Sequence, residues 1–367
     1  MIAAALPRYH FRILRPTGGI GILLGLMLCA APAAFAYTPP PLFRGNPNIQ
    51  GSVTCKDCHL DITQQWARSG HSRADRSKNL LFGRMYFQSL RVTRGATMLK
   101  CGPCHETVAF VNQDFNILRD VTTEGVACAY CHAVAGPGPS TGVPPYELDV
   151  ANYYGSIRNP TYNNTHGSAY TAYLSTSEFC GACHDYKNQN GVQISTTYAE
   201  WKKSKFPKQG VTCQTCHMPG APGRNSYLGP SRPRVANHEF SDSMVMVNRP
   251  GSAPTLTLRA TKAKAGDSLH VYATIANNGW GHSLPTGNDQ HLALIHVRVL
   301  SGSGAIVWEN DPYTEWTVSV FGTILADELG NWPAETWTAT SVLSDRRIKA
   351  GGSAVSRYDV PLGDDKG

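Results

Sequence analysis

Ten cysteines of this 367-residue chain occur in five copies of the motif Cys-x-x-Cys-His. The spacing has a chemical reason, because two thiols so placed can form thioether bonds to the vinyl groups of one porphyrin. The histidine after the second thiol then lies under the iron as its proximal ligand, as in c-type haem attachment. The ten cysteines are Cys55, Cys58, Cys101, Cys104, Cys128, Cys131, Cys180, Cys183, Cys213 and Cys216. The predicted proximal ligands are His59, His105, His132, His184 and His217.

Zinc binding and disulfide formation are the two alternative uses of paired cysteines. Zinc ribbons need pairs of pairs, whereas this chain has an odd number of pairs and a histidine after each. A disulfide within Cys-x-x-Cys closes a small ring that is typical of redox catalysts, not of five parallel structural bridges. The sequence therefore predicts five covalently bound haem c groups.

A haem held by two histidines needs a second imidazole on the far side of its iron, and neutral imidazole is a good metal ligand. Seven histidines lie outside the motifs and outside the N-terminal segment that contains His10. Two of them, His270 and His296, alternate with apolar residues as in a strand, so we expect them to be satisfied surface or core residues. The other five are the predicted distal ligands, although each could instead be a surface histidine bonded to water: His71, His166, His238, His282 and His291.

Residues 1–36 have the form of a secretory signal peptide, with three Arg, a short apolar stretch and an Ala34-Phe35-Ala36 cleavage site. The apolar stretch is too short and too interrupted by Gly to cross a bilayer, and no later stretch is a membrane-span candidate. Export agrees with the chemistry, because c-type haem is attached outside the cytoplasm. Removing the three Arg leaves +4 of the formal charge of +7, which gives no case for nucleic-acid binding.

Composition divides the rest of the chain in two. Residues 37–250 hold all ten motif cysteines and are rich in Gly, Pro, Asn, Ser and Thr. We expect a loop-rich, mainly short-helix pentahaem cytochrome c domain in which the porphyrins serve as the core, with helices over 61–69 and 197–204. Residues 251–367 hold no Cys and predict an all-β, immunoglobulin-like sandwich. Its expected strands are 254–264, 267–277, 291–300, 305–310, 315–324, 336–343 and 353–360.

Two segments resemble the multihaem cytochromes c of the cytochrome c-554 and hydroxylamine-oxidoreductase group. One runs from the first motif to Trp66-x-x-Ser69-x-His71, and the other from Trp201-x-x-Ser204 to the fifth motif. The loop over 277–287 resembles a β-domain loop of related exported cytochromes, so the likeness covers roughly residues 50–300. It implies mostly bis-His haems in stacked and perpendicular pairs, and a role in carrying electrons.

Matched residue by residue, His71 takes that family's distal-ligand position. Phe206 stands at the equivalent place in the second segment, so the ligand of that site must come from elsewhere. The short steps from His105 to His132 and from His184 to His217 suggest two closely packed haem pairs. Some relatives of this general kind polymerise into extracellular filaments, with one haem ligated by the neighbouring subunit.

The leading hypothesis is an exported electron carrier, periplasmic or extracellular, rather than an enzyme. It would pass single electrons between redox partner proteins or extracellular acceptors. One alternative is a haem enzyme that acts on a small nitrogen or sulfur compound at one open-sided haem. Another is a homopolymeric conducting filament. No catalytic triad, phosphate-binding loop or paired-carboxylate site stands out in the β region, so no catalytic residue is predicted.

Overall fold

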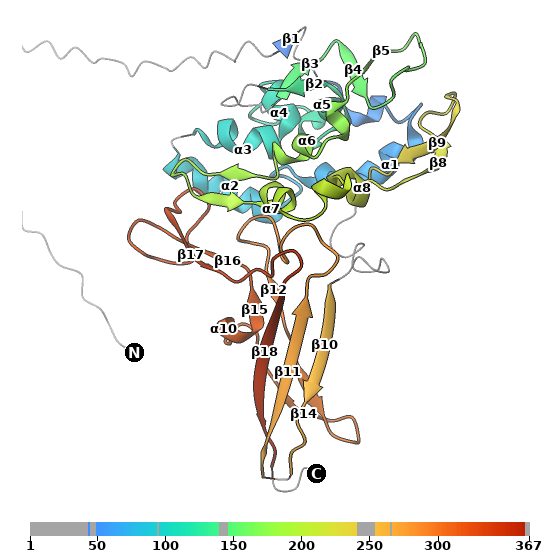
Figure 1. Cartoon of the computed structure of the whole chain (residues 1–367). Helices are drawn as coiled ribbons and strands as arrows, with labels where there is room; N and C mark the ends of the chain where they lie inside the picture. Colours follow the sequence, from blue (N-terminus) through green and yellow to red (C-terminus); the bar gives the residue numbers. More distant parts are fainter. Residues whose placement is uncertain are drawn as a thin grey trace, which may run out of the picture. The chain divides into compact units, whose positions relative to one another are not determined.

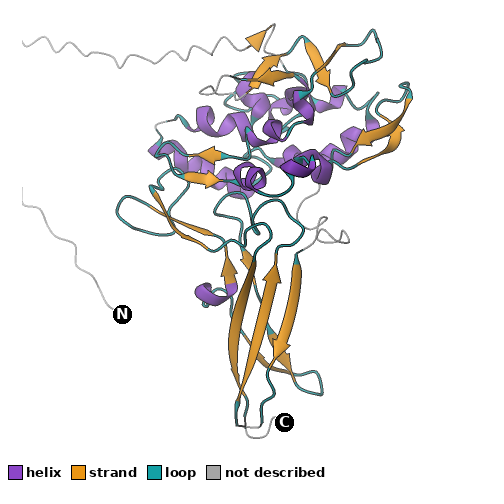
Figure 2. Cartoon of the chain, viewed as in Figure 1, coloured by secondary structure: helices purple, strands orange, loops and turns teal. Residues whose placement is uncertain are grey.

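The computed structural model describes residues 43–44, 49–93, 95–138, 146–240, 254–264 and 266–363. The predicted signal peptide lies outside the described residues. One compact unit spans Pro40–Gly367, so it contains both the cysteine-bearing part and the strand-rich part of the chain. Figure 2 shows that the helices gather in the first of these parts and the long strands in the second. Within the described ranges, no helix has the length and apolar character needed to cross a membrane.

Short helices dominate the cysteine-bearing part (Figure 1). They are α1 (Leu60–Arg68), α2 (Leu80–Val92), α3 (Thr97–His105), α4 (Thr107–Val111), α5 (Cys128–His132), α6 (Ser177–Gly181), α7 (Thr197–Lys203) and α8 (Cys213–His217). Single 3₁₀ turns precede or separate them: η1 (Ser52–Thr54), η2 (His71–Arg73), η3 (Asp120–Thr123), η4 (Tyr173–Ser175) and η5 (Pro207–Gln209). The two helices predicted over 61–69 and 197–204 are confirmed as α1 and α7.

The strands of this part are short and pair locally. The small sheets are β1 (Phe43–Arg44) with β2 (Val134–Pro137) and β3 (Tyr146–Asp149), β4 (Asn152–Gly155) with β5 (Gly167–Tyr170), β6 (Tyr186–Lys187) with β7 (Gln193–Ser195), and β8 (Gly220–Arg224) with β9 (Ser231–Ala236). An apolar cluster that includes Val108, Tyr130 and Leu148 packs between α4, α5 and β3. Its small size fits a region in which covalently attached apolar groups are expected to supply the rest of the core.

A three-stranded antiparallel sheet organises the C-terminal part. It consists of β10 (Thr255–Ala260), β11 (Ser268–Ala276) and β18 (Ser353–Pro361), with β11 in the middle. Val271 and Ala273 of β11 face the same side as Tyr358 and Val360 of β18, and all four are buried. The remaining elements are β12 (Ala293–Leu294) with β15 (Val320–Phe321), β13 (Arg298–Leu300) with β14 (Ile306–Glu309), β16 (Thr323–Ala326) with β17 (Ser341–Asp345), and the helical turn α10 (Trp316–Ser319).

Three predicted strands differ from the observed elements. The segment 291–300 splits into β12 and β13, because its two halves pair with different partners, β15 and β14. The segment 315–324 opens with α10, since the carbonyl of Glu315 accepts backbone hydrogen bonds from Val318 and Ser319. The segment 336–343 begins as a turn and reaches strand geometry only at β17. The fold is therefore a loop-rich short-helix region followed by small separate sheets, and the immunoglobulin-like sandwich stays a prediction.

Candidate haem-attachment sites

Each Cys-x-x-Cys-His motif occupies about one helical turn. The second motif ends α3, and the third and fifth motifs form α5 and α8. The fourth motif begins in α6, and the first lies between η1 and α1. In that first motif the amide of His59 donates to the carbonyl of Cys55 at 2.8 Å, and in the fourth that of His184 donates to Cys180 at 3.0 Å. Residues three apart on a helical turn lie on one face, so both thiols of a motif point to the same side.

The ten motif cysteines are free thiols in the structure, so no disulfide joins them. Three pairs of thiols from different motifs lie close enough to shift each other's pKa: Cys55 with Cys128, Cys104 with Cys183, and Cys180 with Cys213. These thiols stand in for the thioether sulfurs of an attached haem. The first motif is thus beside the third, and the fourth is beside both the second and the fifth.

Four of the five proximal histidines face a second histidine ring. The centroids are 6.4 Å apart for His59 and His166, 6.2 Å for His71 and His184, 6.3 Å for His132 and His238, and 6.2 Å for His217 and His282. A metal–imidazole bond is about 2.0–2.1 Å long and the ring centroid lies about 1 Å beyond the nitrogen, so two imidazoles across one iron have centroids about 6 Å apart. The four pairs fit a bis-His iron between the rings. Four predicted distal histidines, all but His291, are the ones that supply these pairs.

Most of these imidazoles place Nδ1 beside a backbone carbonyl oxygen. The contacts are His59 with Asn225 at 2.5 Å, His132 with Tyr154 at 2.6 Å, His166 with Gly167 at 3.0 Å, His238 with Ala236 at 2.9 Å and His282 with Ser283 at 3.1 Å. An Nδ1–H that donates to a carbonyl leaves the Nε2 lone pair free and orients the ring, which is the usual arrangement around a metal-ligating histidine.

Burial keeps several of these rings neutral. Burial, together with a smaller effect of the neighbouring His184, lowers the pKa of His71 to about 3. Burial is also the main reason why the pKa values of His184 and His238 fall to about 4. At pH 7 these imidazoles are therefore uncharged, which is the form that binds a metal.

The second motif differs from the other four. Among the described residues, His105 has no ring contact with another histidine. Its imidazole stacks on the Phe82 ring, with centroids 4.2 Å apart and planes 13° from parallel. A ring stacked on the imidazole face lies beside the proximal ligand and not across the iron from it, so Phe82 leaves the distal position unaccounted for.

His291 is the predicted distal ligand that faces no proximal histidine in the described residues. Its side chain is exposed, and its Nδ1 lies 2.7 Å from the carbonyl oxygen of Thr286. Its role stays a prediction. His270 and His296, which were not predicted to be ligands, lie near the surface beside carboxylates. Nδ1 of His270 is 2.6 Å from Oδ1 of Asp359, and Nε2 of His296 is 3.3 Å from Oε2 of Glu309.

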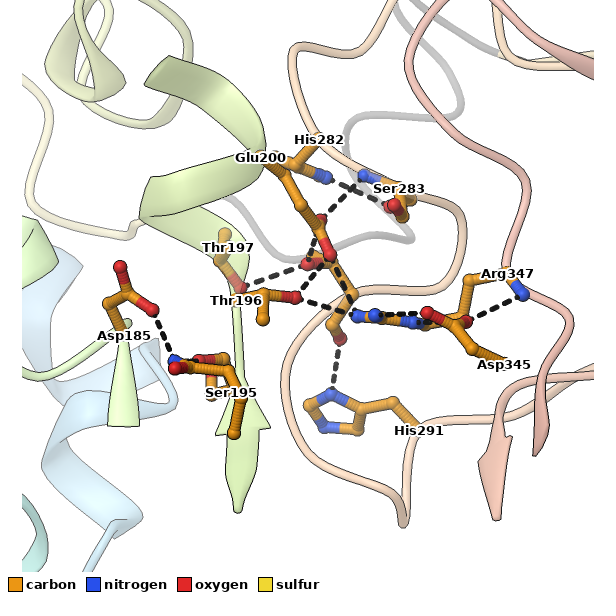
Figure 3. Close-up of polar contacts among 12 residues, drawn as sticks. Asp185, Ser195, Thr196, Thr197, Glu200, His282, Ser283, His291, Asp345 and Arg347 are labelled. Atoms are coloured by element: carbon orange, nitrogen blue, oxygen red, sulfur yellow. Dashed lines mark hydrogen bonds and ion pairs between the residues drawn. The ribbon is translucent and has the colours of Figure 1, made fainter. Parts of the chain in front are cut away.

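A partly buried carboxylate holds the loop that carries His282 (Figure 3). Oε2 of Glu200, on α7, accepts from the amide of Ser283 at 2.8 Å and from the hydroxyl of Thr286 at 2.9 Å. Its Oε1 accepts from Nη1 of Arg347 at 2.8 Å. Burial alone would raise the pKa of Glu200, but a hydrogen bond from the Thr196 hydroxyl, the bonds above and the arginine charge together lower it. The carboxylate thus ties α7, which follows the fourth motif, to the loop that faces the fifth.

Aromatic rings adjoin the imidazoles, and most of them cannot be predicted from the sequence. Phe240 lies edge-on to His71 at 4.4 Å, Tyr153 lies 5.0 Å from His166, and Trp280 lies 5.6 Å from His282. Neither these rings nor Glu200 and its partners carry a motif of their own. They become visible only once the fold brings distant segments together.

Comparisons with known proteins agree with this geometry. Residues 54–133 match the family described as cytochrome c554 and c-prime. The fold is similar to the crystal structure of a penta-heme cytochrome c552 from Thermochromatium tepidum, with a TM-score of 0.68 and 22% sequence identity over 88% of this chain and 89% of that chain. No curated protein sequence matches. The predicted resemblance to multihaem c-type cytochromes of the c554 family is confirmed.

Proposed function

We propose that this chain, a multihaem c-type cytochrome related to the c554 family, carries single electrons between redox partners through five covalently bound haem c groups. The observation that carries the proposal is the set of four histidine pairs, each at the separation that suits one shared iron. Haem iron with two imidazole ligands supplies a one-electron couple and offers no free coordination position for a substrate.

The protein's own part is to hold the attachment sites next to one another. The thiol contacts support a row in which the first motif neighbours the third, and the fourth neighbours the fifth and the second. The third and fourth are linked in turn, because the buried Tyr130 of the third motif lies close enough to Cys104 and Cys183 to interact with both electrostatically. Such closeness favours electron movement along the whole chain of sites.

The surrounding residues tune these sites without reacting themselves. Backbone carbonyls orient the imidazoles through Nδ1, and aromatic rings exclude water from their edges. Axial ligand, hydrogen bonding and burial are the means by which a protein sets haem potentials. We place the mature protein outside the cytoplasm, because covalent haem attachment occurs there and residues 1–36 have the composition of an export signal.

Haem counting and redox titration test the proposal directly. Protein purified from a host competent in cytochrome maturation should carry five haems per chain by intact mass. A reductive titration should then take up five electrons per chain. A mature chain with the mass of its amino acids alone would overturn the proposal.

The second motif favours one further candidate function, a haem enzyme that acts on a small nitrogen or sulfur compound. The reason is specific: His105 alone among the proximal histidines has no histidine opposite it in the part of the chain that the structure describes. An open distal side there would leave room for a small molecule.

Carbon monoxide binding separates the two candidates. If the site is open, the reduced protein should bind one carbon monoxide per chain, and the oxidised protein should show one high-spin ferric haem by electron paramagnetic resonance. If His291 completes the site, the native protein should bind none, and His291→Ala should bind one. Absence of binding in the native protein would remove the enzyme candidate.

A further inference from the structure

We propose that the outer face of α2 docks an acidic single-electron carrier protein beside the second motif. This surface, called here the α2 face, consists of the exposed residues Leu80, Leu81, Arg84, Phe87, Gln88, Arg91 and Val92. The inference rests on the proposed function and adds to it a place of docking and the charge of the partner.

The inner face of α2 packs against the protein interior. Phe82, Tyr86 and Ser89 are buried along it, and the Phe82 ring stacks on the imidazole of His105. The helix begins at a side-chain cap, because Oδ1 of Asn79 accepts from the amide of Phe82 at 2.9 Å. The cap and the buried face together set the rotation of the helix, so the residues opposite them must face outward.

The outward residues are unusually apolar for an exposed helix surface. Leu80 is 84% exposed, Phe87 61% and Val92 60%. Positions 80, 84, 87 and 91 follow one stripe of a helix with 3.6 residues per turn, so leucine, arginine, phenylalanine and arginine alternate along it. Large exposed apolar side chains that cluster in this way mark interaction sites more often than scattered single ones do.

The charge along this stretch of the sequence has one sign. Between Asp75 and Glu106 the sequence has six Lys and Arg and no Asp or Glu. The two bounding carboxylates are themselves fully buried, and Glu106 is taken up by Arg76, whose Nη1 lies 3.3 Å from its Oε2. Carboxylates of this stretch therefore do not offset the exposed Arg84 and Arg91, and the α2 face suits a partner that carries carboxylates around an apolar centre.

Two other occupants fit the face less well. A second copy docked through the same face would set arginines against arginines across a two-fold axis, which is unfavourable. A helix that lies in a membrane surface carries its basic residues on the face opposite its apolar one. Here Arg84 and Arg91 share the stripe with Leu80 and Phe87. Arginine and aromatic residues mixed at one patch are typical of protein interfaces.

The position of the α2 face gives docking a consequence. Phe82 and Arg84 are two residues apart and so point to nearly opposite sides of α2, which means that the width of one helix separates the imidazole of His105 from the exposed stripe. A partner seated on Arg84, Phe87 and Arg91 would lie directly over the second attachment site. The thiol contact of Cys104 with Cys183 connects that site to the rest of the row.

The test measures how fast the oxidised holoprotein accepts electrons from reduced plant-type ferredoxin, an acidic one-electron donor, in a stopped-flow instrument. The second-order rate constant should fall steeply as ionic strength rises, because opposite charges steer the encounter. The double variant Arg84→Glu/Arg91→Glu should react about tenfold more slowly at low ionic strength. Phe87→Ser should be slower than the native protein at every ionic strength.

A matched control separates local from global charge. The exposed Lys262 and Lys264 lie between β10 and β11, in the strand-rich part of the chain, and Lys262→Glu/Lys264→Glu changes the net charge by the same amount. This control should react within about twofold of the native rate. Equal rates for the two double variants would overturn the docking proposal. Binding to phosphatidylserine vesicles is the second outcome that would overturn the proposal. If the native protein binds them, the Arg84→Glu/Arg91→Glu variant does not, and the ferredoxin rates of the two are equal, the α2 face is a membrane-binding surface.

Reduction by dithionite distinguishes this failure from failure of the proposed function. All variants should take up the same number of electrons from dithionite, a small reductant that needs no protein docking surface, and should keep the native haem spectrum. If they do, and the α2 variants react with ferredoxin at the native rate, only the docking proposal is wrong and the proposed function stands. If the native protein itself takes up no electrons, the proposed function fails.

Discussion

Replacing Cys180 and Cys183 together with serine is expected to remove one haem per chain and to destabilise the fold strongly. The cost should exceed the about 2–5 kcal/mol of a large-to-small core substitution, because the vacated space is far larger than that left by a side chain. The location adds to the effect. Cys183 packs against the apolar cluster around Leu148, and its thiol meets Cys104, while that of Cys180 meets Cys213. Intact mass and thermal unfolding of the purified holoprotein measure the two losses.

The same substitution at the first motif is the matched control. Cys55→Ser with Cys58→Ser should also remove one haem, since the chemistry lost is identical. The free energy of unfolding should fall by less, because Cys58 is exposed and the first motif neighbours only the third through the thiol contacts seen here. Electron redistribution among the remaining four sites should slow in the Cys180/Cys183 variant and not in the control. Equal destabilisation by the two variants would contradict a central position for the fourth motif.

The proximal ligands could be predicted from sequence because a covalent requirement determines their spacing. Two thiols and a histidine within five residues act locally, so no knowledge of the fold is needed. The distal ligands are different, because each comes from a segment far away in the chain. His71 follows the first motif in sequence yet faces His184 of the fourth, and His166 faces the first. The sequence identifies these histidines as candidate distal ligands, but it does not show which proximal histidine each one faces.

The spacing between motifs is a weak guide to which thiols meet. Short steps suggested that the second and third motifs form a close pair, as do the fourth and fifth. A thiol contact supports the second suggestion, between Cys180 and Cys213. The second and third motifs meet differently, through the hydroxyl of Tyr130, which donates to the carbonyl of Pro103 at 3.1 Å, while their thiols reach Cys183 and Cys55. Chain distance sets which motifs can be near, and side-chain packing decides which thiols touch.

Phe206 shows how a departure from a family pattern can be informative. The sequence comparison put phenylalanine where the related segment has His71, and required a ligand from elsewhere. In the structure the Phe206 ring lies under Gly281, where an added Cβ would come within 2.9 Å of it. Gly281 precedes His282, which faces His217 of the fifth motif. Phe206 therefore contacts the loop that places His282, the candidate distal ligand, opposite His217.

The network around Glu200 could not have been found from sequence. Glu200 and Arg347 are 147 residues apart and belong to no motif, and their side chains are only 16% and 12% exposed. An ion pair so enclosed is costly unless hydrogen bonds satisfy its oxygens. Here the Ser283 amide and the Thr286 hydroxyl do so. The strand-rich part of the chain therefore holds His282 opposite His217 of the fifth motif.

Replacing His282 with methionine should raise the midpoint potential of one haem by on the order of 100 mV or more, within the about 0.8 V that axial ligation spans. The reason is that a thioether donates less to ferric iron than imidazole does, so it favours the reduced state. His282 is the right position because its ring faces His217 with centroids 6.2 Å apart, and Glu200 holds its loop in place. A spectroelectrochemical titration of the variant and the native protein measures the shift.

His270→Met is the matched control for this substitution. His270 lies on β11 in the same part of the chain and is bonded to the exposed Asp359, away from any proximal histidine in the described residues. The control should leave all five potentials as they are. A shift in His282→Met confined to one haem would show that the strand-rich part supplies an iron ligand to the cysteine-bearing part. Unchanged potentials in both variants would show that the ligand opposite His217 is another residue, and the role inferred for the Glu200 network would fall with it.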